Sequence, residues 1–153
     1  MLCVHGNPTW SFYWRHLVSS MSDSYRMIVP DHIGMGLSDK PGDDRYKYTL
    51  ESRVDDLDAL LAELGIEEDV TIIAHDWGGM IGLAWAVRNR RKVKRLVLLN
   101  TAGFLLPEGR SLPWQLKLIR RIPSSLTVRG FNAFVRGALL SCSKRPGRMR
   151  RRG

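Results

Sequence analysis

The fold is decided by one stretch of sequence, Val70-Thr71-Ile72-Ile73-Ala74-His75-Asp76-Trp77-Gly78-Gly79. Its apolar and β-branched residues predict a buried strand, one acidic residue follows, and two glycines open a helix. This layout is typical of a nucleophile elbow, with Asp76 where a serine usually stands. A carboxylate nucleophile forms alkyl esters by attacking carbon that bears a leaving group, so the stretch predicts covalent catalysis.

The residues around Asp76 suit a tight turn from strand to helix. Ala74 lies two positions before it, Gly78 lies two positions after it, and Gly79 allows the helix to pack closely on the strand. The N-terminus of the predicted helix points toward the carboxylate and helps to keep it ionised. The alternative is that Asp76 only caps this helix, because aspartate is a favoured N-cap residue.

A second candidate segment is His5-Gly6-Asn7-Pro8-Thr9-Trp10. Its glycine turn follows a buried strand and brings backbone N–H groups and the Asn7 amide to the mouth of the sheet. With the N–H of Trp77 these donors predict an oxyanion hole. The Asn7 amide and the Trp77 indole are also donors for an anionic leaving group. The alternatives are a turn residue for Asn7 and a packed aromatic for Trp77, and His5 is interpreted as structural.

Strands alternate with amphipathic helices along residues 1–105. Strands are predicted at 1–4, 26–30, 70–74 and 94–99, and helices at 10–21, 50–64 and 78–90. This order predicts an α/β fold with a mainly parallel sheet of about four strands and flanking helices. The apolar runs at 70–74 and 96–99 are expected to be covered on both faces. The clearest helix has one apolar face, with Thr49 as N-cap and Gly65 as C′ residue; the face consists of Leu50, Val54, Leu57, Leu61 and Leu64.

The pattern changes after residue 105. Two helices, 114–122 and 126–140, follow with no strand between them, so residues 106–140 are predicted to begin a helical lid. Phe131 and Phe134 share a face of the second helix, which we interpret as lining a channel for alkyl chains. The alternative is that this face packs on its own domain. Residues 141–153 form a basic tail, expected to be disordered or the product of a frameshift.

Composition limits the function classes. The net charge is +9, but residues 144–153 carry six positive charges, leaving +3 for the rest, so the basic pI describes the tail. No aromatic residues interleave the basic run, which disfavours nucleic-acid binding. The two cysteines form no disulfide framework or metal cluster and suit a reducing, cytoplasmic setting. We expect no metal, no cofactor and no transmembrane segment.

Three motifs in this order resemble one superfamily: HGNPTW, the D-x-x-G-x-G-x-S loop that begins at Asp31, and the HDWGG elbow. Together they look like the α/β-hydrolase superfamily and, within it, the haloalkane dehalogenase group. Residues 99–104 and 128–134 are most similar to a related group, the β-lactone decarboxylases of bacterial long-chain olefin biosynthesis. The Asp31 loop is interpreted as mainly structural, with its glycines and Ser38 shaping a loop near the site.

The resemblance implies an activity and the roles of three residues. Asp76 would be the nucleophile, and Asn7 and Trp77 would hold the leaving group. The reaction would convert a small hydrophobic substrate, a cis-3,4-dialkyl-β-lactone, to a cis-alkene and CO2, with other olefin-pathway enzymes as partners. The alternatives are a haloalkane dehalogenase and, from another class, a non-catalytic protein with a basic interaction tail. An epoxide hydrolase is disfavoured because every tyrosine precedes the elbow.

The catalytic partners of Asp76 are not found in this sequence. A triad on this fold runs nucleophile, acid, histidine in chain order, but His5, His16, His32 and His75 all precede Asp76. Asn100 stands where some dehalogenases carry an acid. We therefore expect a fragment truncated at both ends, with the triad acid and histidine outside it and without multiple turnover.

Overall fold

The computed structural model describes residues 1–101 and 135–137. The chain divides into two units, Met1–Leu105 and Leu106–Gly153, and every element with a label belongs to the first. Of the second unit only residues 135–137 are described, and they are helical. Phe131, Phe134, most of the predicted lid and the basic tail lie outside the described residues, so the predictions for them and the division into three parts stay predictions.

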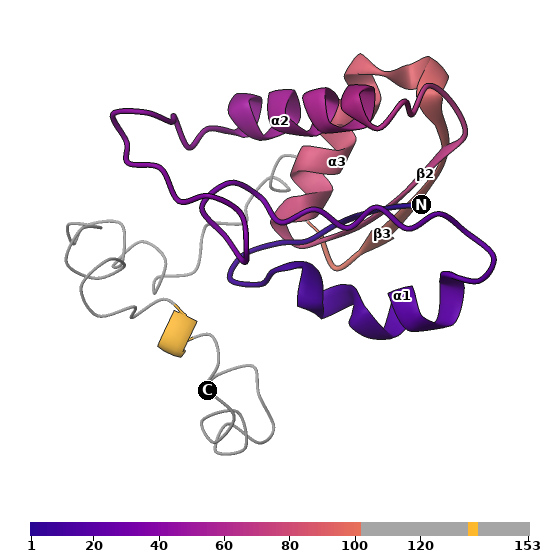
Figure 1. The fold of residues 1–153 in the computed structure, drawn as a ribbon, viewed down its shortest axis with the longest axis horizontal. Helices are drawn as coiled ribbons and strands as arrows, with labels where there is room; N and C mark the ends of the chain where they lie inside the picture. Colours follow the sequence, from indigo (N-terminus) through magenta and orange to yellow (C-terminus); the bar gives the residue numbers. More distant parts are fainter. Residues whose placement is uncertain (102–134, 138–153) are drawn as a thin grey trace, which may run out of the picture. The chain divides into compact units, whose positions relative to one another are not determined.

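Three parallel strands form the sheet, in the order β1 (Leu2–Val4), β2 (Val70–His75), β3 (Val93–Leu99) (Figure 1). The predicted α/β architecture with a parallel sheet is confirmed. The expectation of about four strands is wrong for the described residues, because segment 26–30 is bridged to β1 only between Leu2 and Ile28. Ile28 makes two backbone hydrogen bonds here: its carbonyl accepts the Cys3 N–H, and its N–H donates to the carbonyl of Met1, just before β1.

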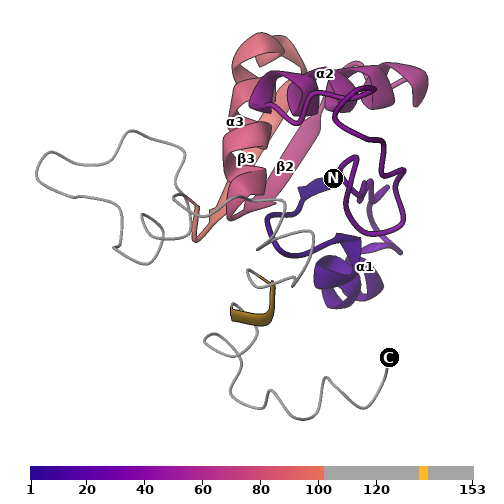
Figure 2. The same cartoon turned by 90° about the vertical axis from the view of Figure 1, so that its left-hand side faces the viewer.

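The alternation of side chains along the strands divides the core between two faces of the sheet. On one face the strands pack against α2 (Leu50–Glu63) and α3 (Trp77–Arg88); on the other they pack against Trp14 and α1 (Arg15–Met21) (Figures 1 and 2). The strand residues of the first face are Leu2, Val4, Val70, Ile72 and Ala74, and those of the second are Cys3 and Ile73. Burial raises the pKa of the Cys3 thiol to about 11, which makes it unreactive.

Helix α2 follows its sequence pattern closely. The Thr49 hydroxyl accepts a hydrogen bond from the Ser52 N–H over 3.2 Å and caps the helix, as predicted. Gly65 has φ +65°, the left-handed conformation expected of a C′ residue. Three residues of the predicted apolar face are buried, namely Val54, Leu57 and Leu61, whereas Leu50 in the first turn is 41% exposed.

Two other helices differ from their predicted bounds. The predicted helix 10–21 begins as a 3-10 turn, η1 (Ser11–Trp14), before α1, because the Tyr13 N–H bonds to the Trp10 carbonyl three residues back. α3 begins at Trp77, directly after the elbow residue, and ends at Arg88; a second 3-10 turn, η2 (Arg90–Lys92), leads into β3. None of the described helices combines the length and the apolar character needed to cross a bilayer.

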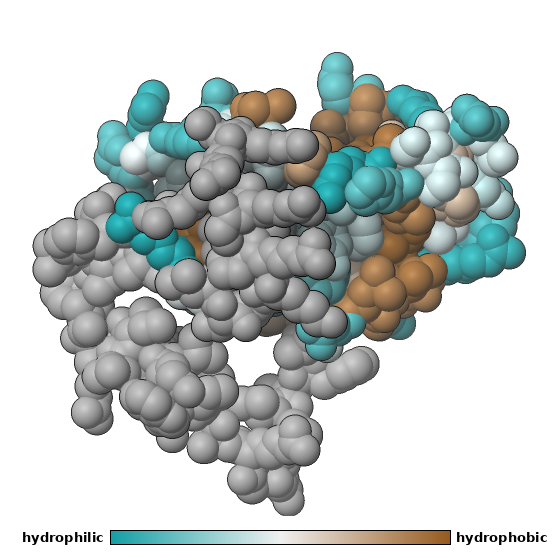
Figure 3. Space-filling view, turned by 90° about the horizontal axis from the view of Figure 1, so that it is seen from below, coloured by the Kyte–Doolittle hydropathy of each residue, from teal (hydrophilic) through white to brown (hydrophobic). Residues whose placement is uncertain are grey.

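The expected coverage of the strands is confirmed for β2 and wrong for β3. Residues 70–74 are buried, but Leu96–Leu99 are 39–44% exposed. β3 is the edge of the described sheet and is paired on one side only, and the described helices leave its apolar side chains half-exposed. The space-filling view from the α1 side shows a group of apolar side chains exposed at the surface (Figure 3).

Candidate functional site

The candidate site is the turn between β2 and α3. Asp76 occupies it with φ +54° and ψ −129°, a conformation that L-residues rarely adopt. Such a backbone costs about 1–3 kcal/mol and persists only where the surroundings enforce it. The tight turn predicted from the sequence is therefore present, the structure shows that it is strained, and Asp76 lies at the end of β2.

The Asp76 carboxylate contacts a second loop and leaves its own helix uncapped. Its Oδ1 atom accepts a hydrogen bond from the backbone N–H of Asn7 over 2.8 Å. Its side chain makes no capping hydrogen bond to α3. The alternative that Asp76 is simply a helix cap is therefore wrong, and the two candidate segments of the sequence meet at this carboxylate.

Two glycines allow this close approach of the loops. A Cβ atom on Gly6 would lie 2.7 Å from the Asp76 Cγ atom, and one on Gly78 would lie 2.6 Å from the carbonyl oxygen of His5. Neither contact is tolerated by real side chains. The loop after β1 and the first turn of α3 therefore require glycine at these positions.

Thr101 braces the elbow from the end of β3. Its hydroxyl donates a hydrogen bond to the backbone carbonyl of Asp76 over 2.6 Å. It also fills the space beside Gly79, where a Cβ atom would lie 2.5 Å from the Thr101 Cβ. Sequence reasoning missed this residue. Its only signal was its position just after a parallel strand, because the ends of neighbouring parallel strands meet at one edge.

The other candidate residues lie around the same turn. Asn7 reaches Asp76 through its backbone N–H, and Trp77 is the first residue of α3 and is 53% exposed. The ring of His75 stacks on Tyr13, with 4.8 Å between ring centres. The assigned roles of Asn7 and Trp77 in holding a leaving group stay predictions.

Two buried histidines lie beside the Asn7 loop. His5 is completely buried, as expected of a structural residue, and His32 is 7% exposed. Burial lowers the pKa of both; for His32, with a further contribution from the charges of His5 and Arg53, it lies at about 4. Burial alone would raise the pKa of Asp31, but the N–H groups of Leu37 and Ser11 outweigh it and the pKa lies below its usual value.

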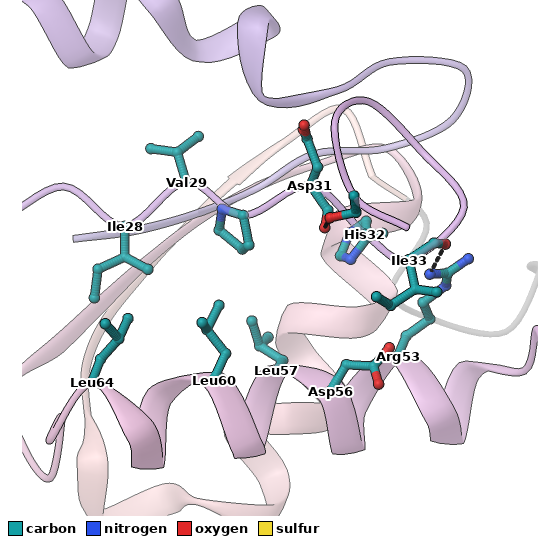
Figure 4. Close-up of a pocket in the computed structure, with 12 residues that line it drawn as sticks. Ile28, Val29, Asp31, His32, Ile33, Arg53, Asp56, Leu57, Leu60 and Leu64 are labelled. Carbon is teal, nitrogen blue, oxygen red and sulfur yellow. Dashed lines mark hydrogen bonds between the residues drawn. The ribbon is translucent and has the colours of Figure 1, made fainter. Parts of the chain in front are cut away.

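A cavity of about 440 Å³ opens between α2 and residues 28–33. Leu57, Leu60 and Leu64 project from α2 toward the segment of residues 28–33, and Leu64 faces Ile28 (Figure 4). It is lined mainly by apolar side chains and lies away from the elbow, since its lining comes from other segments. Within residues 1–101 and 135–137, no cluster of three or more histidine, cysteine, aspartate or glutamate side chains is arranged to hold a metal ion.

Comparison with known proteins gives consistent results. A family model described as alpha/beta hydrolase fold matches residues 1–136. A cis-3-alkyl-4-alkyloxetan-2-one decarboxylase of Xanthomonas campestris pv. campestris is 54% identical, over 99% of this chain and 53% of that protein. A protein of the same name from Shewanella oneidensis is also 54% identical, over 88% of this chain and 42% of that protein.

A solved structure agrees with this likeness. A haloalkane dehalogenase of Agrobacterium tumefaciens C58 is 30% identical, with a TM-score of 0.75, and the match covers 87% of this chain and 46% of that one. The chain thus spans about half the length of the curated relatives that it matches.

Proposed function

Since the chain belongs to the alpha/beta hydrolase fold family, we propose that it carries the nucleophile of a β-lactone decarboxylase, and that this nucleophile is Asp76. The observation that carries the proposal is the strained elbow, at which the Asn7 N–H holds one oxygen of the Asp76 carboxylate. Two relatives at 54% identity are named for decarboxylation of an oxetan-2-one, which is a β-lactone, and they supply the substrate class.

The proposed reaction has two steps and needs no co-substrate. In the first step, Oδ2 of Asp76 attacks the alkyl ring carbon that is bonded to the ring oxygen, and not the carbonyl carbon. The C–O bond of the ring breaks, an alkyl ester forms on Asp76, and the ring opens to a carboxylate. In the second, the bond between the carboxylate and its carbon breaks, its electron pair forms the alkene, CO2 leaves, and the ester bond returns its electrons to Asp76.

The neighbours of Asp76 contribute electrostatics to this scheme. The Asn7 N–H keeps the carboxylate oriented, and a hydrogen bond to a charged acceptor contributes about 1.5–3 kcal/mol. The Asn7 side-chain amide and the Trp77 indole N–H are the donors proposed to hold the carboxylate released from the ring, as they would a halide. The exposed position of Trp77 leaves its indole accessible to a substrate.

The lactone is favoured over a haloalkane by the two relatives at 54% identity, and the chemistry of the intermediate distinguishes the two substrates. The ester from a β-lactone carries its own carboxylate and frees Asp76 by losing CO2. The ester from a haloalkane has no such group and must be hydrolysed by water that a base activates. Under this proposal the substrate is small and hydrophobic, the partners are other olefin-pathway enzymes, and the protein acts in the cytoplasm.

Product analysis tests the proposal. The chain, in excess over substrate so that one event per molecule suffices, is mixed with a cis-3,4-dialkyl-β-lactone or with a 1-bromoalkane of similar length. We expect alkene and CO2 from the lactone, lost in Asp76→Asn and kept in Asp55→Asn, which changes an exposed aspartate of α2. Bromide release without alkene formation would instead support the haloalkane dehalogenase, and neither product would refute both.

A further inference from the structure

The loop that carries Asn7 is fixed at both ends by two adjacent residues of another segment. At its far end the Ser11 N–H donates a hydrogen bond to Asp31 Oδ1 over 2.6 Å. At its near end the His32 N–H donates to His5 Nε2, and His32 Nε2 lies 3.1 Å from the His5 carbonyl oxygen. One dipeptide thus spans the two ends of the loop.

The near end is held in one protonation state. Because His5 Nε2 accepts the His32 N–H, the proton of the neutral His5 ring is on Nδ1, which lies 2.9 Å from the Gly6 carbonyl oxygen and donates to it. The His32 ring is then oriented to donate from Nε2 to the His5 carbonyl. The two ring centres lie 4.4 Å apart, and burial keeps both rings neutral. Each of these three ring nitrogens is therefore fixed as either a hydrogen-bond donor or an acceptor.

The far end is held by a carboxylate that is itself fixed. Asp31 Oδ2 accepts the Leu37 N–H over 2.8 Å, and the Ser38 hydroxyl donates to the Asp31 carbonyl over 2.6 Å. On the other side of His32, the Arg53 guanidinium on α2 donates to the carbonyl of Ile33 (Figure 4). The bonds from Leu37 and Ser38 fix Asp31 within residues 31–38, and the bond from Arg53 ties Ile33, next to His32, to α2.

Between its two ends the loop has little freedom left. Thr9 closes a turn on Gly6, since its N–H and its hydroxyl both donate to the Gly6 carbonyl, over 3.2 Å and 2.9 Å. Asn7 lies inside this turn, and its N–H points to Asp76 Oδ1. The position of that N–H is thus determined by the turn and by the two ends that Asp31 and His32 hold.

We propose that Asp31 and His32 are positioning residues for the nucleophile: by holding both ends of residues 5–11 they keep the Asn7 N–H on the Asp76 carboxylate. No hydrogen bond or ion pair joins either residue to Asp76, so they act through the loop. The consequence for catalysis rests on the proposed function, whereas the consequence for the Asn7–Asp76 hydrogen bond does not.

Amide hydrogen exchange of the ¹⁵N-labelled chain tests the hydrogen bond directly. In Asp31→Ala and His32→Ala, exchange of the Asn7 amide is expected to accelerate at least tenfold, while the amides of β2 change less than twofold. His32→Gln keeps an N–H donor for the His5 carbonyl and should restore part of the protection. Leu37→Ala, which changes an 85% exposed side chain in the segment of Asp31 and His32, should leave Asn7 exchange unchanged.

Two results would overturn the proposal. One is unchanged Asn7 exchange in both alanine variants. The other is an equal loss of protection at Asn7 and in β2, which would mean that the residues hold the whole fold. A separate measurement, the rate of Asp76 ester formation with a β-lactone, is expected to fall at least tenfold in both variants. If the unsubstituted chain forms no ester, the proposed function fails while the exchange result stands.

Discussion

Replacing Asp76 by glycine is expected to stabilise the chain relative to replacing it by alanine. Both substitutions remove the carboxylate and its hydrogen bond to Asn7, so the difference between them isolates the backbone. At φ +54° and ψ −129° a residue with a Cβ atom is strained by about 1–3 kcal/mol, and glycine is not. Against this, glycine gives the unfolded chain extra entropy that costs about 0.5–1 kcal/mol.

The net expectation is that Asp76→Gly exceeds Asp76→Ala in free energy of unfolding by roughly 1 kcal/mol. The matched control is Asp55, an exposed aspartate in the middle of α2. There the order should reverse, with Asp55→Ala more stable than Asp55→Gly by about 1 kcal/mol, because glycine weakens a regular helix.

Urea unfolding, monitored by tryptophan fluorescence, gives the free energy of unfolding of all four variants. Their unfolding midpoints are compared where the free energy falls with urea concentration at the same slope. If Asp76→Ala proves as stable as Asp76→Gly, or more stable, the elbow stores no strain. The reasoning that ties the backbone of Asp76 to its function would then be refuted.

Three further predictions concern residues around the elbow and the core. Thr101→Val should cost about 1–2 kcal/mol of unfolding free energy, because the Asp76 carbonyl loses its donor, whereas Thr101→Ser should keep most of it. His32 has a pKa of about 4 when folded and near 6.5 when unfolded. The unfolded state therefore binds more protons between these values, and stability should fall by up to roughly 3 kcal/mol as the pH drops from 6.5 to 4, less steeply in His32→Gln. Trp85→Phe should cost about 1–3 kcal/mol, because a completely buried indole loses its bond to Asp58. Urea unfolding measures the free energy of unfolding for each variant, and for His32 it is repeated between pH 6.5 and pH 4. A change below about 0.3 kcal/mol in Thr101→Val, in Trp85→Phe or across the pH series would contradict the prediction concerned.

Local sequence patterns predicted the elements that are stabilised by residues close to them in the sequence. The Thr49 cap and the Gly65 end of α2 follow from residue type and are confirmed, and of its apolar face Val54, Leu57 and Leu61 are buried as predicted. The elbow was equally visible, because its strand, acidic residue and glycines are contiguous. The sequence predicted only that the segments of Asp76 and Asn7 lie at the same edge of the sheet. The structure adds the hydrogen bond between them.

Features that depend on distant partners escaped sequence reasoning. Segment 26–30 has the composition of a strand, but it is bridged to β1 at one position only, between Leu2 and Ile28. The exposure of β3 depends on what lies beside it, which its own apolar residues do not encode. The bond from Thr101 to Asp76 and the His5–His32 pair join residues about 25 positions apart, and no periodicity connects such residues.

Mass spectrometry of the Asp76 peptide after rapid quenching is the most direct test of the central claim, that Asp76 is a covalent nucleophile. After the chain is mixed with a cis-3,4-dialkyl-β-lactone and digested, the peptide that contains Asp76 should gain the full mass of the lactone. The adduct should be absent in Asp76→Asn and present in Asp55→Asn. Alkene formation at equal rates in the chain and in Asp76→Asn, with no adduct on the Asp76 peptide, would contradict the claim.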